Sequence, residues 1–111
     1  MAHHVGGLYN VPHGEANAIL LPHTMRFNLD GARAKFSELA HVVGAGGPDD
    51  FVAWLGRLKR EIGIAPSLGA VGVQREQIPA LVAIAERDTC HQTNPRPVSR
   101  ADFERFFQQA F

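Results

Sequence analysis

Apolar residues recur at helical spacing in five separate stretches of this chain, and strand-like alternation is absent. The first stretch opens at Pro12-His13, and its helical face carries Ala16, Ile19, Leu20, His23 and Phe27. Pro22 lies inside this pattern. Because proline has no amide hydrogen to donate, we expect a kink or break near Leu21. The following segment, Asn28–Gly31, predicts a turn, with Asp30 as a candidate helix cap.

Two further helices are predicted in the middle of the chain. One runs roughly from Ala32 to Val43 and is ended by the glycine-rich run at 44–48. Asp49 or Asp50 is expected to cap the next helix, with Pro48 just outside it. The apolar stripe of this third helix consists of Phe51, Trp54, Leu55, Leu58 and Ile62.

The C-terminal part of the chain predicts two more helices. Pro79 suits the first turn of one of them. Its expected buried face consists of Ile78, Leu81, Val82 and Ala85. Ser99 and Asp102 resemble a capping box at the start of the last helix. Its stripe consists of Phe103, Phe106, Phe107 and Phe111. Residues 70–73 tolerate a strand but are too few to predict one, so the pattern indicates an all-α bundle of about five helices in a single domain, residues 1–111.

Composition and charge narrow the choice of function without identifying one. With 111 residues the chain is long enough for one domain, but not for a dinucleotide-binding domain beside a substrate domain. Its 45% hydrophobic content excludes a disordered chain, and 11 basic against 11 acidic residues give no reason to expect nucleic acid or an anionic membrane as a partner. Cys90 is the single cysteine and no signal-peptide pattern is present, so we expect a cytoplasmic protein without a membrane-spanning segment.

Three histidines near the N-terminus form the first candidate site. Imidazole binds divalent transition metals, so His3, His4 and His13 together suit zinc or iron. Adjacent helical residues point about 100° apart, and His13 lies well beyond the other two, so the spacing does not predict a complete local site. The alternative interpretation is a frayed terminus at His3-His4, with His13 as a polar residue at a helix start.

Other polar residues have structural interpretations. His23, on the apolar face of the first predicted helix, is expected to be a hydrogen-bonded core residue, and His41 is expected to be solvated. Cys90 and His91 are the residue types of a nucleophile–base pair, but adjacent loop residues rarely bring sulfur and imidazole into contact. Asn94-Pro95-Arg96-Pro97 predicts a rigid loop.

Residues 1–23, taken as one motif, resemble a signature of the iron-containing (group III) alcohol dehydrogenases. The shared pattern is a His, a pair of small residues, Tyr-Asn, then Pro-His-Gly-x-Ala-Asn-Ala and an apolar run that ends in Pro-His. Residues 78–81, the stretch to Asp88, residues 93–97 and the closing helix after Ser99 resemble the C-terminal end of the same family. The chain is therefore identified as similar to a truncated C-terminal helical domain, the last quarter to third of such an enzyme.

The resemblance implies a role for two of the histidines. In this family an N-terminal domain holds NAD(P), and one Asp and three His hold a catalytic Fe²⁺ or Zn²⁺. His13 matches the last histidine ligand, and His3 matches a non-ligand histidine near the nicotinamide that handles a proton or orients the substrate. The other three ligands and the cofactor loop have no counterpart in these residues. We therefore expect the isolated chain to bind neither metal nor NAD(P) and to lack dehydrogenase activity. Whether it forms part of an enzyme stays open, because the family is one of alcohol dehydrogenases.

Three functions remain open at this point. In the favoured one, the chain is the metal-binding part of an alcohol dehydrogenase, completed by an N-terminal dehydrogenase fragment. In the second, it is a stand-alone helical module that forms a homodimer or binds partners without catalysis. In the third, it is a small metal-binding protein that uses His3, His4 and His13.

Overall fold

The computed structural model describes all 111 residues and consists of helices and loops. Its α-helices are α1 (Ala2–Tyr9), α2 (His13–Val42), α3 (Pro48–Glu61), α4 (Ile78–Arg87) and α5 (Arg100–Gln109). Three short 3-10 helices lie between them: η1 (Gly69–Val71), η2 (Arg75–Gln77) and η3 (Thr89–Thr93). The absence of strands confirms the predicted all-α class, and the number of α-helices is also five, although α1 is not among the predicted ones. None of the helices has the length and apolar character needed to cross a membrane.

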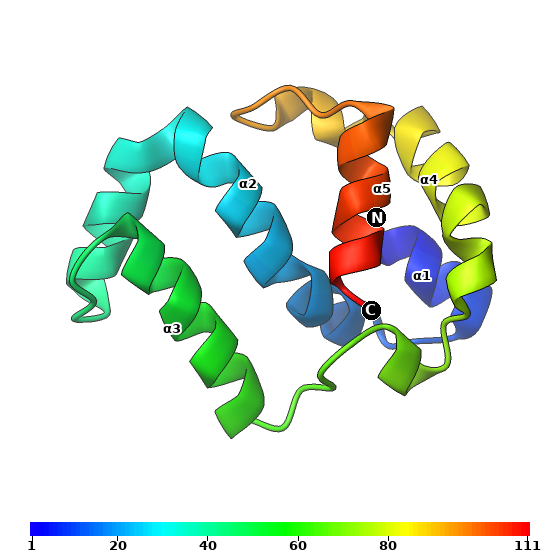
Figure 1. The fold of residues 1–111 in the computed structure, drawn as a ribbon, viewed down its shortest axis with the longest axis horizontal. Coiled ribbons are helices and arrows are strands. Elements are labelled where there is room, and N and C mark those ends of the chain that lie inside the picture. The colour runs from blue at the N-terminus through cyan, green and yellow to red at the C-terminus, as the bar shows by residue number, and fades with distance from the viewer.

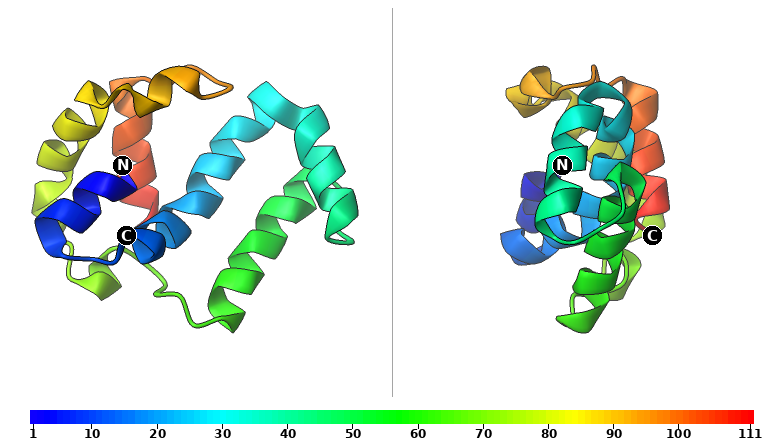
Figure 2. Two further views of the ribbon diagram at one scale, coloured as in Figure 1. Left: turned by 180° about the vertical axis from the view of Figure 1, so that it is seen from behind. Right: turned by 90° about the vertical axis from the view of Figure 1, so that its left-hand side faces the viewer.

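Helix α2 crosses the middle of the molecule and separates two groups of helices (Figure 1). On one side α3 packs along it, and on the other α1, α4 and α5 gather around its first half. The molecule is flat, with extents of 38 × 31 × 18 Å, as the edge-on view of Figure 2 shows. The buried apolar residues form two separate clusters, one on each side of α2.

Two hydrophobic clusters share α2 as a common wall. The larger contains 16 buried residues from α1, the start of α2, the η1 region, α4 and α5. Its fully buried side chains include Val5, Ile19, Leu68, Leu81 and Phe107. The smaller consists of Leu29, Phe36 and Ala40 of α2 with Phe51 and Val52 of α3. A change in the path of α2 would therefore disturb both clusters.

The N-terminal residues form helix α1, so the alternative of a frayed terminus is wrong. Ala2 and Val5 are buried and Tyr9 packs against the larger cluster, which holds one face of this short helix. The helix ends at Asn10, whose φ of 55° is left-handed. Because the Gly6-Gly7 pair lowers the helix propensity of this stretch, its helical form depends on tertiary packing.

Helix α2 passes through Pro22 with helical backbone angles, so the break predicted near Leu21 is absent. Its one residue with non-helical backbone angles is Ala32, at φ −146° and ψ 31°. The turn predicted over Asn28–Gly31 is also wrong, because these residues are helical and Asp30 does not cap a new helix. The two predicted helices join directly at a kink at Ala32, so the predicted start of the second helix near this residue is confirmed. Buried residues on both sides of the proline hold it, and their packing outweighs the hydrogen bond that proline cannot make.

Helix α3 starts slightly earlier than predicted. Pro48, expected just outside the helix, is its first residue, and Gly47 occupies the cap position. Asp49 and Asp50 therefore lie in the first turn, where a carboxylate interacts favourably with the helix dipole, and neither caps the helix with its side chain. Ile62, expected on the apolar stripe, follows the end of the helix and is 63% exposed.

The predictions for the last two α-helices are confirmed. The four residues expected on the inner face of α4 are all buried, as are three of the four phenylalanines of the last stripe; Phe111 is half-buried. The capping box is present: the Ser99 side chain accepts a hydrogen bond from the backbone N–H of Asp102, and the Asp102 carboxylate accepts one from the backbone N–H of Ser99 at 2.9 Å. Both helices are specified by signals within about ten residues of chain.

The loop that follows η3 meets α2 at Gly31. A Cβ atom on Gly31 would lie 2.9 Å from the carbonyl oxygen of Pro95 and 3.2 Å from Cβ of Arg96. Both distances are too short for a side chain, so only glycine allows the loop to approach this closely. The contact lies immediately before the bend at Ala32.

We expect Gly31→Ala to lower the free energy of unfolding by about 1–3 kcal/mol, because the added methyl group must displace the Pro95 backbone. Gly56→Ala is the matched control. Gly56 lies within α3, where a Cβ atom would meet only Nη1 of Arg60, at 3.9 Å. Alanine there should raise the free energy of unfolding by about 0.5–1 kcal/mol through its helix propensity. Urea unfolding of the two variants measures both effects, and equal effects would show that the loop does not constrain Gly31.

Candidate functional site

Folding brings the sequence-predicted site residues His3 and His13 together. Helix α1 packs against the start of α2, and the two imidazole rings lie 6.0 Å apart between centroids, at an angle of 78°. His4, next to His3 on α1, has its ring centroid 5.6 Å from that of His3. The rings of His3 and His13 belong to exposed residues, so their nitrogens are accessible from outside the domain.

His4 also contacts Asp88, which directly follows α4. The Nε2 atom of His4 lies 3.1 Å from Oδ2 of Asp88, and the other carboxylate oxygen accepts a hydrogen bond from the backbone N–H of Cys90 at 3.0 Å. Hydrogen bonds from Cys90, and then the one from His4, hold the pKa of Asp88 well below its usual range. Asp88 thus stays ionised and orients His4. No local sequence signal predicts this contact, because the two residues are 84 positions apart.

The chain's own residues provide only part of a metal-binding set. His3 and His13 offer two neighbouring imidazoles, but no group of three or more His, Cys, Asp or Glu side chains in the structure could hold a metal ion. Zinc sites take three or four protein ligands. A metal at His13 would therefore need further ligands from residues beyond these 111.

Cys90 and His91 point to different partners. Hydrogen bonding to Asp88 and the charge of that carboxylate raise the pKa of the Cys90 thiol, which disfavours the thiolate. The Nε2 atom of His91 lies 3.3 Å from the carbonyl oxygen of Glu86, and its ring meets that of Phe103 edge-on at 5.4 Å. The structure therefore does not place a nucleophile beside a base here.

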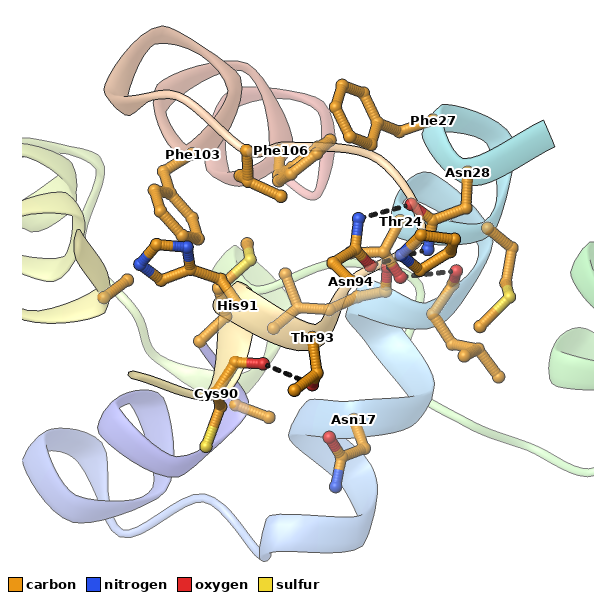
Figure 3. A pocket seen from close by; sticks show the side chains of 18 of the residues that line it. Asn17, Thr24, Phe27, Asn28, Cys90, His91, Thr93, Asn94, Phe103 and Phe106 are labelled. Carbon is orange, nitrogen blue, oxygen red and sulfur yellow. Dashed lines mark hydrogen bonds between the residues drawn. The ribbon is translucent and has the colours of Figure 1, made fainter. Parts of the chain in front are cut away.

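A groove of about 910 Å³ runs between α2, η3 and α5, and Figure 3 shows it from close by. Phe27 and Phe106 contribute to its apolar surface, and Asn94 and Thr93 present polar groups to it. Apolar side chains from α2 extend the groove, among them Leu39, which is 44% exposed. We call this feature the α2–η3 groove. It leaves an apolar surface open that a folded protein ordinarily covers.

The floor of the α2–η3 groove is fastened by an amide pair that sequence reasoning missed. Nδ2 of Asn28 donates to Oδ1 of Asn94 at 2.9 Å, and Nδ2 of Asn94 donates to Oδ1 of Asn28 at 2.7 Å. Arg96 adds a second tie: its Nη1 donates to the carbonyl oxygen of Phe27 and to Asp30, both at 3.1 Å, and its guanidinium lies 4.1 Å from the centre of the Phe27 ring. The predicted rigid loop at residues 94–97 is thus fixed to α2 by side-chain contacts.

The remaining two candidate histidines lie farther along α2. His41 is exposed, as expected. His23 is half-buried where α2 faces α3, and no hydrogen bond to its ring is present, so the prediction of a hydrogen-bonded core histidine is wrong. Burial lowers the pKa of His23, and the charges of Lys59 and Arg26 lower it further.

Comparison with known proteins places these residues in a larger context. The chain matches the family described as "Fe-containing alcohol dehydrogenase family, C-terminal" over residues 1–111. It is 40% identical to lactaldehyde reductase of Escherichia coli (strain K12) and 36% identical to 1,3-propanediol dehydrogenase of Klebsiella pneumoniae. Each of these alignments covers 100% of this chain and 31% of the relative.

Solved structures match the fold as well. The structure of a 1,3-propanediol oxidoreductase matches with a TM-score of 0.93 at 36% identity, over 99% of this chain and 31% of that one. An alcohol dehydrogenase from Oenococcus oeni matches with a TM-score of 0.93 at 29% identity and the same coverage. The chain thus spans about a third of the length of these relatives.

We expect Asn94→Ala to lower the free energy of unfolding by about 1–3 kcal/mol, because it leaves the buried amide of Asn28 without its partner. Combined with Asn28→Ala, the loss should be smaller than the sum of the two single losses. Asn17→Ala, at an exposed residue of the same groove, is the control and should change stability by no more than about 0.5 kcal/mol. Urea unfolding of the four variants tests this, and strictly additive losses would contradict a coupled amide pair.

His23 is expected to make stability depend on pH on the acid side of neutrality. Because folding lowers its pKa from an unfolded value of about 6.5, the unfolded state binds the proton more readily. Its stabilising contribution is full above about pH 6.5 and is lost as the pH falls through the lowered pKa. His23→Gln should flatten the decrease in unfolding free energy between about pH 7.5 and 5.5, whereas His41→Gln should retain it. Superimposable pH profiles of the wild-type protein and His23→Gln would contradict this assignment.

Proposed function

This chain belongs to the Fe-containing alcohol dehydrogenase family, whose C-terminal part it matches along its whole length, and we propose that it contributes His13 and His3 to the active site of a metal-dependent, NAD(P)-linked alcohol dehydrogenase. The observation that carries the proposal is the meeting of these two rings at 6.0 Å, although they lie on different helices. The relatives' names, which refer to lactaldehyde and 1,3-propanediol, suggest a short, hydroxylated alcohol or aldehyde as the substrate.

In this proposal the two histidines have different tasks. His13, the exposed first residue of α2, acts as one metal ligand. When bound, Fe²⁺ or Zn²⁺ supplies Lewis-acid polarisation of the substrate oxygen. His3, beside it on α1, holds or releases a proton at an imidazole nitrogen near that oxygen.

The packing of α1 determines how accurately these rings are placed. Val5 of α1 and Ala16 of α2 are completely buried, so the helices that carry the two histidines are fixed to each other. The hydrogen bond from His4 to Asp88 ties α1 to the end of α4 as well. Catalytic groups require positioning of this kind, since small displacements of a ligand or proton donor cost large factors in rate.

The remaining ligands and the cofactor-binding surface must come from other residues, in a preceding part of the same protein or in a separate N-terminal dehydrogenase fragment. A second candidate function, a non-catalytic module that forms a homodimer or binds another protein, is supported by the apolar surface of the α2–η3 groove. The two candidates differ in what they require of His13, and one experiment separates them.

Co-expression of the chain with the N-terminal two-thirds of E. coli lactaldehyde reductase is expected to give a complex that retains metal and oxidises short diols with NAD⁺. His13→Ala should reduce metal content and activity by about 100-fold or more, because removing a ligand opens the site. His3→Gln should keep the metal, lower kcat by about 100-fold and alter its pH profile, since proton transfer contributes a factor of this size.

His41→Ala is the control, an exposed histidine on the same helix that should leave both readouts unchanged. A complex that forms but holds metal equally well with and without His13 would overturn the proposal. A chain that pairs only with itself, as seen by sedimentation, and never forms the complex would favour the non-catalytic module.

A further inference from the structure

A second hollow, about 420 Å³ in volume, lies between α2 and α3 on a different part of the molecule from the histidine pair. Its rim carries positive charge from both helices, Arg26 from α2 and Arg57 and Arg60 from α3, with His23 beside them. The floor includes Gly56, which has no side chain to fill the space. Nη1 of Arg60 would lie 3.9 Å from a Cβ atom at Gly56, so this guanidinium lies beside the glycine.

These cations have no acidic partners. The structure contains ion pairs for four other arginines, Arg33, Arg96, Arg100 and Arg105. None of the arginines of the hollow forms an ion pair, and neither does the neighbouring Lys59, whose ammonium donates to the carbonyl oxygen of Pro66. The pKa of His23 beside them is lowered, first by burial and then by the charges of Lys59 and Arg26.

The helix dipole accounts for the positions of only some of these cations. Cations near the C-terminal end of a helix interact favourably with its dipole, which accounts for Lys59 and Arg60 in the last turn of α3. Arg26 and His23 come from the middle of α2, where no such benefit exists. Packing α2 against α3 therefore gathers like charges at a cost that a bound anion would offset.

We propose that this hollow binds a phosphate group through the guanidinium groups of Arg26, Arg57 and Arg60. Guanidinium is planar and offers paired N–H donors that match the oxygens of a phosphate. The hollow admits a group of this size, and its cations converge from two helices. The site goes beyond the proposed dehydrogenase function, because it involves neither His3 nor His13.

Calorimetric titration of the full chain with inorganic phosphate, pyrophosphate and glycerol 3-phosphate, at fixed low ionic strength, tests the proposal. We expect saturable binding of at least one of the three, and weakening of that binding by about tenfold or more in Arg57→Gln/Arg60→Gln. Binding of inorganic phosphate and pyrophosphate alone would identify the free anion as the ligand, and tighter binding of glycerol 3-phosphate would identify a phosphorylated metabolite. Arg33→Gln/Arg87→Gln removes the same charge from exposed positions outside the hollow and should bind as the wild type does.

Thermal unfolding provides a second readout in case the double substitution alters the fold. Without phosphate, Arg57→Gln/Arg60→Gln should melt within a few degrees of the wild type, because the repulsion that is removed offsets the lost interaction of Arg60 with the helix dipole. With phosphate, the wild-type Tm should rise and that of the double variant should not. The proposal is overturned if none of the three probes binds saturably, or if the double variant binds as tightly as the wild type.

Discussion

Everything else in this molecule depends on helix α2 remaining a single rigid element as far as its bend at Ala32. The helix forms a wall of both hydrophobic clusters, so α3 on one side and α1, α4 and α5 on the other have no fixed relation except through it. Buried residues on either side of Pro22 maintain the helix through a residue that cannot donate a backbone hydrogen bond. Packing on two sides is what makes this proline tolerable, because a break there would expose apolar surface in both clusters at once.

The loop that follows η3 determines where α2 bends. The amide pair between Asn28 and Asn94 and the contacts of Arg96 fasten this loop to the last turns before the bend. At Gly31 the loop backbone approaches so closely that no side chain fits between. Beyond this point α2 turns at Ala32, and its remaining turns pack with the start of α3. The direction of the last turns of α2, and with it the position of α3, therefore depends on contacts that the loop at residues 94–96 makes with α2.

This arrangement explains which features the sequence could predict. Helices α4 and α5 begin at a proline and a capping box and have a regular apolar face, so their signals are local and their predicted features are present. The bend at Ala32 depends on a loop more than 60 positions away, and the pair of His4 and Asp88 spans 84 positions, so neither leaves a pattern within one helix. The meeting of His3 and His13 could not be predicted from spacing, because it depends on the packing of α1 against α2. Residue type marked both as metal-binding candidates, the family resemblance implied their separate roles, and those roles stay a prediction.

The two sites that the structure suggests differ in how far they depend on other residues. The histidine pair lies on exposed surface and no group of three potential metal ligands forms there, in a chain that covers 31% of the length of these relatives. The cationic hollow is formed entirely by α2 and α3. At a rise of 1.5 Å per residue, His13 and Arg26 are separated by about 20 Å along α2, roughly twice the distance over which charges act in physiological salt. A phosphate in the hollow would therefore influence the histidine pair only through α2, by holding the helix more firmly against α3, and the two sites can be tested independently on the same protein.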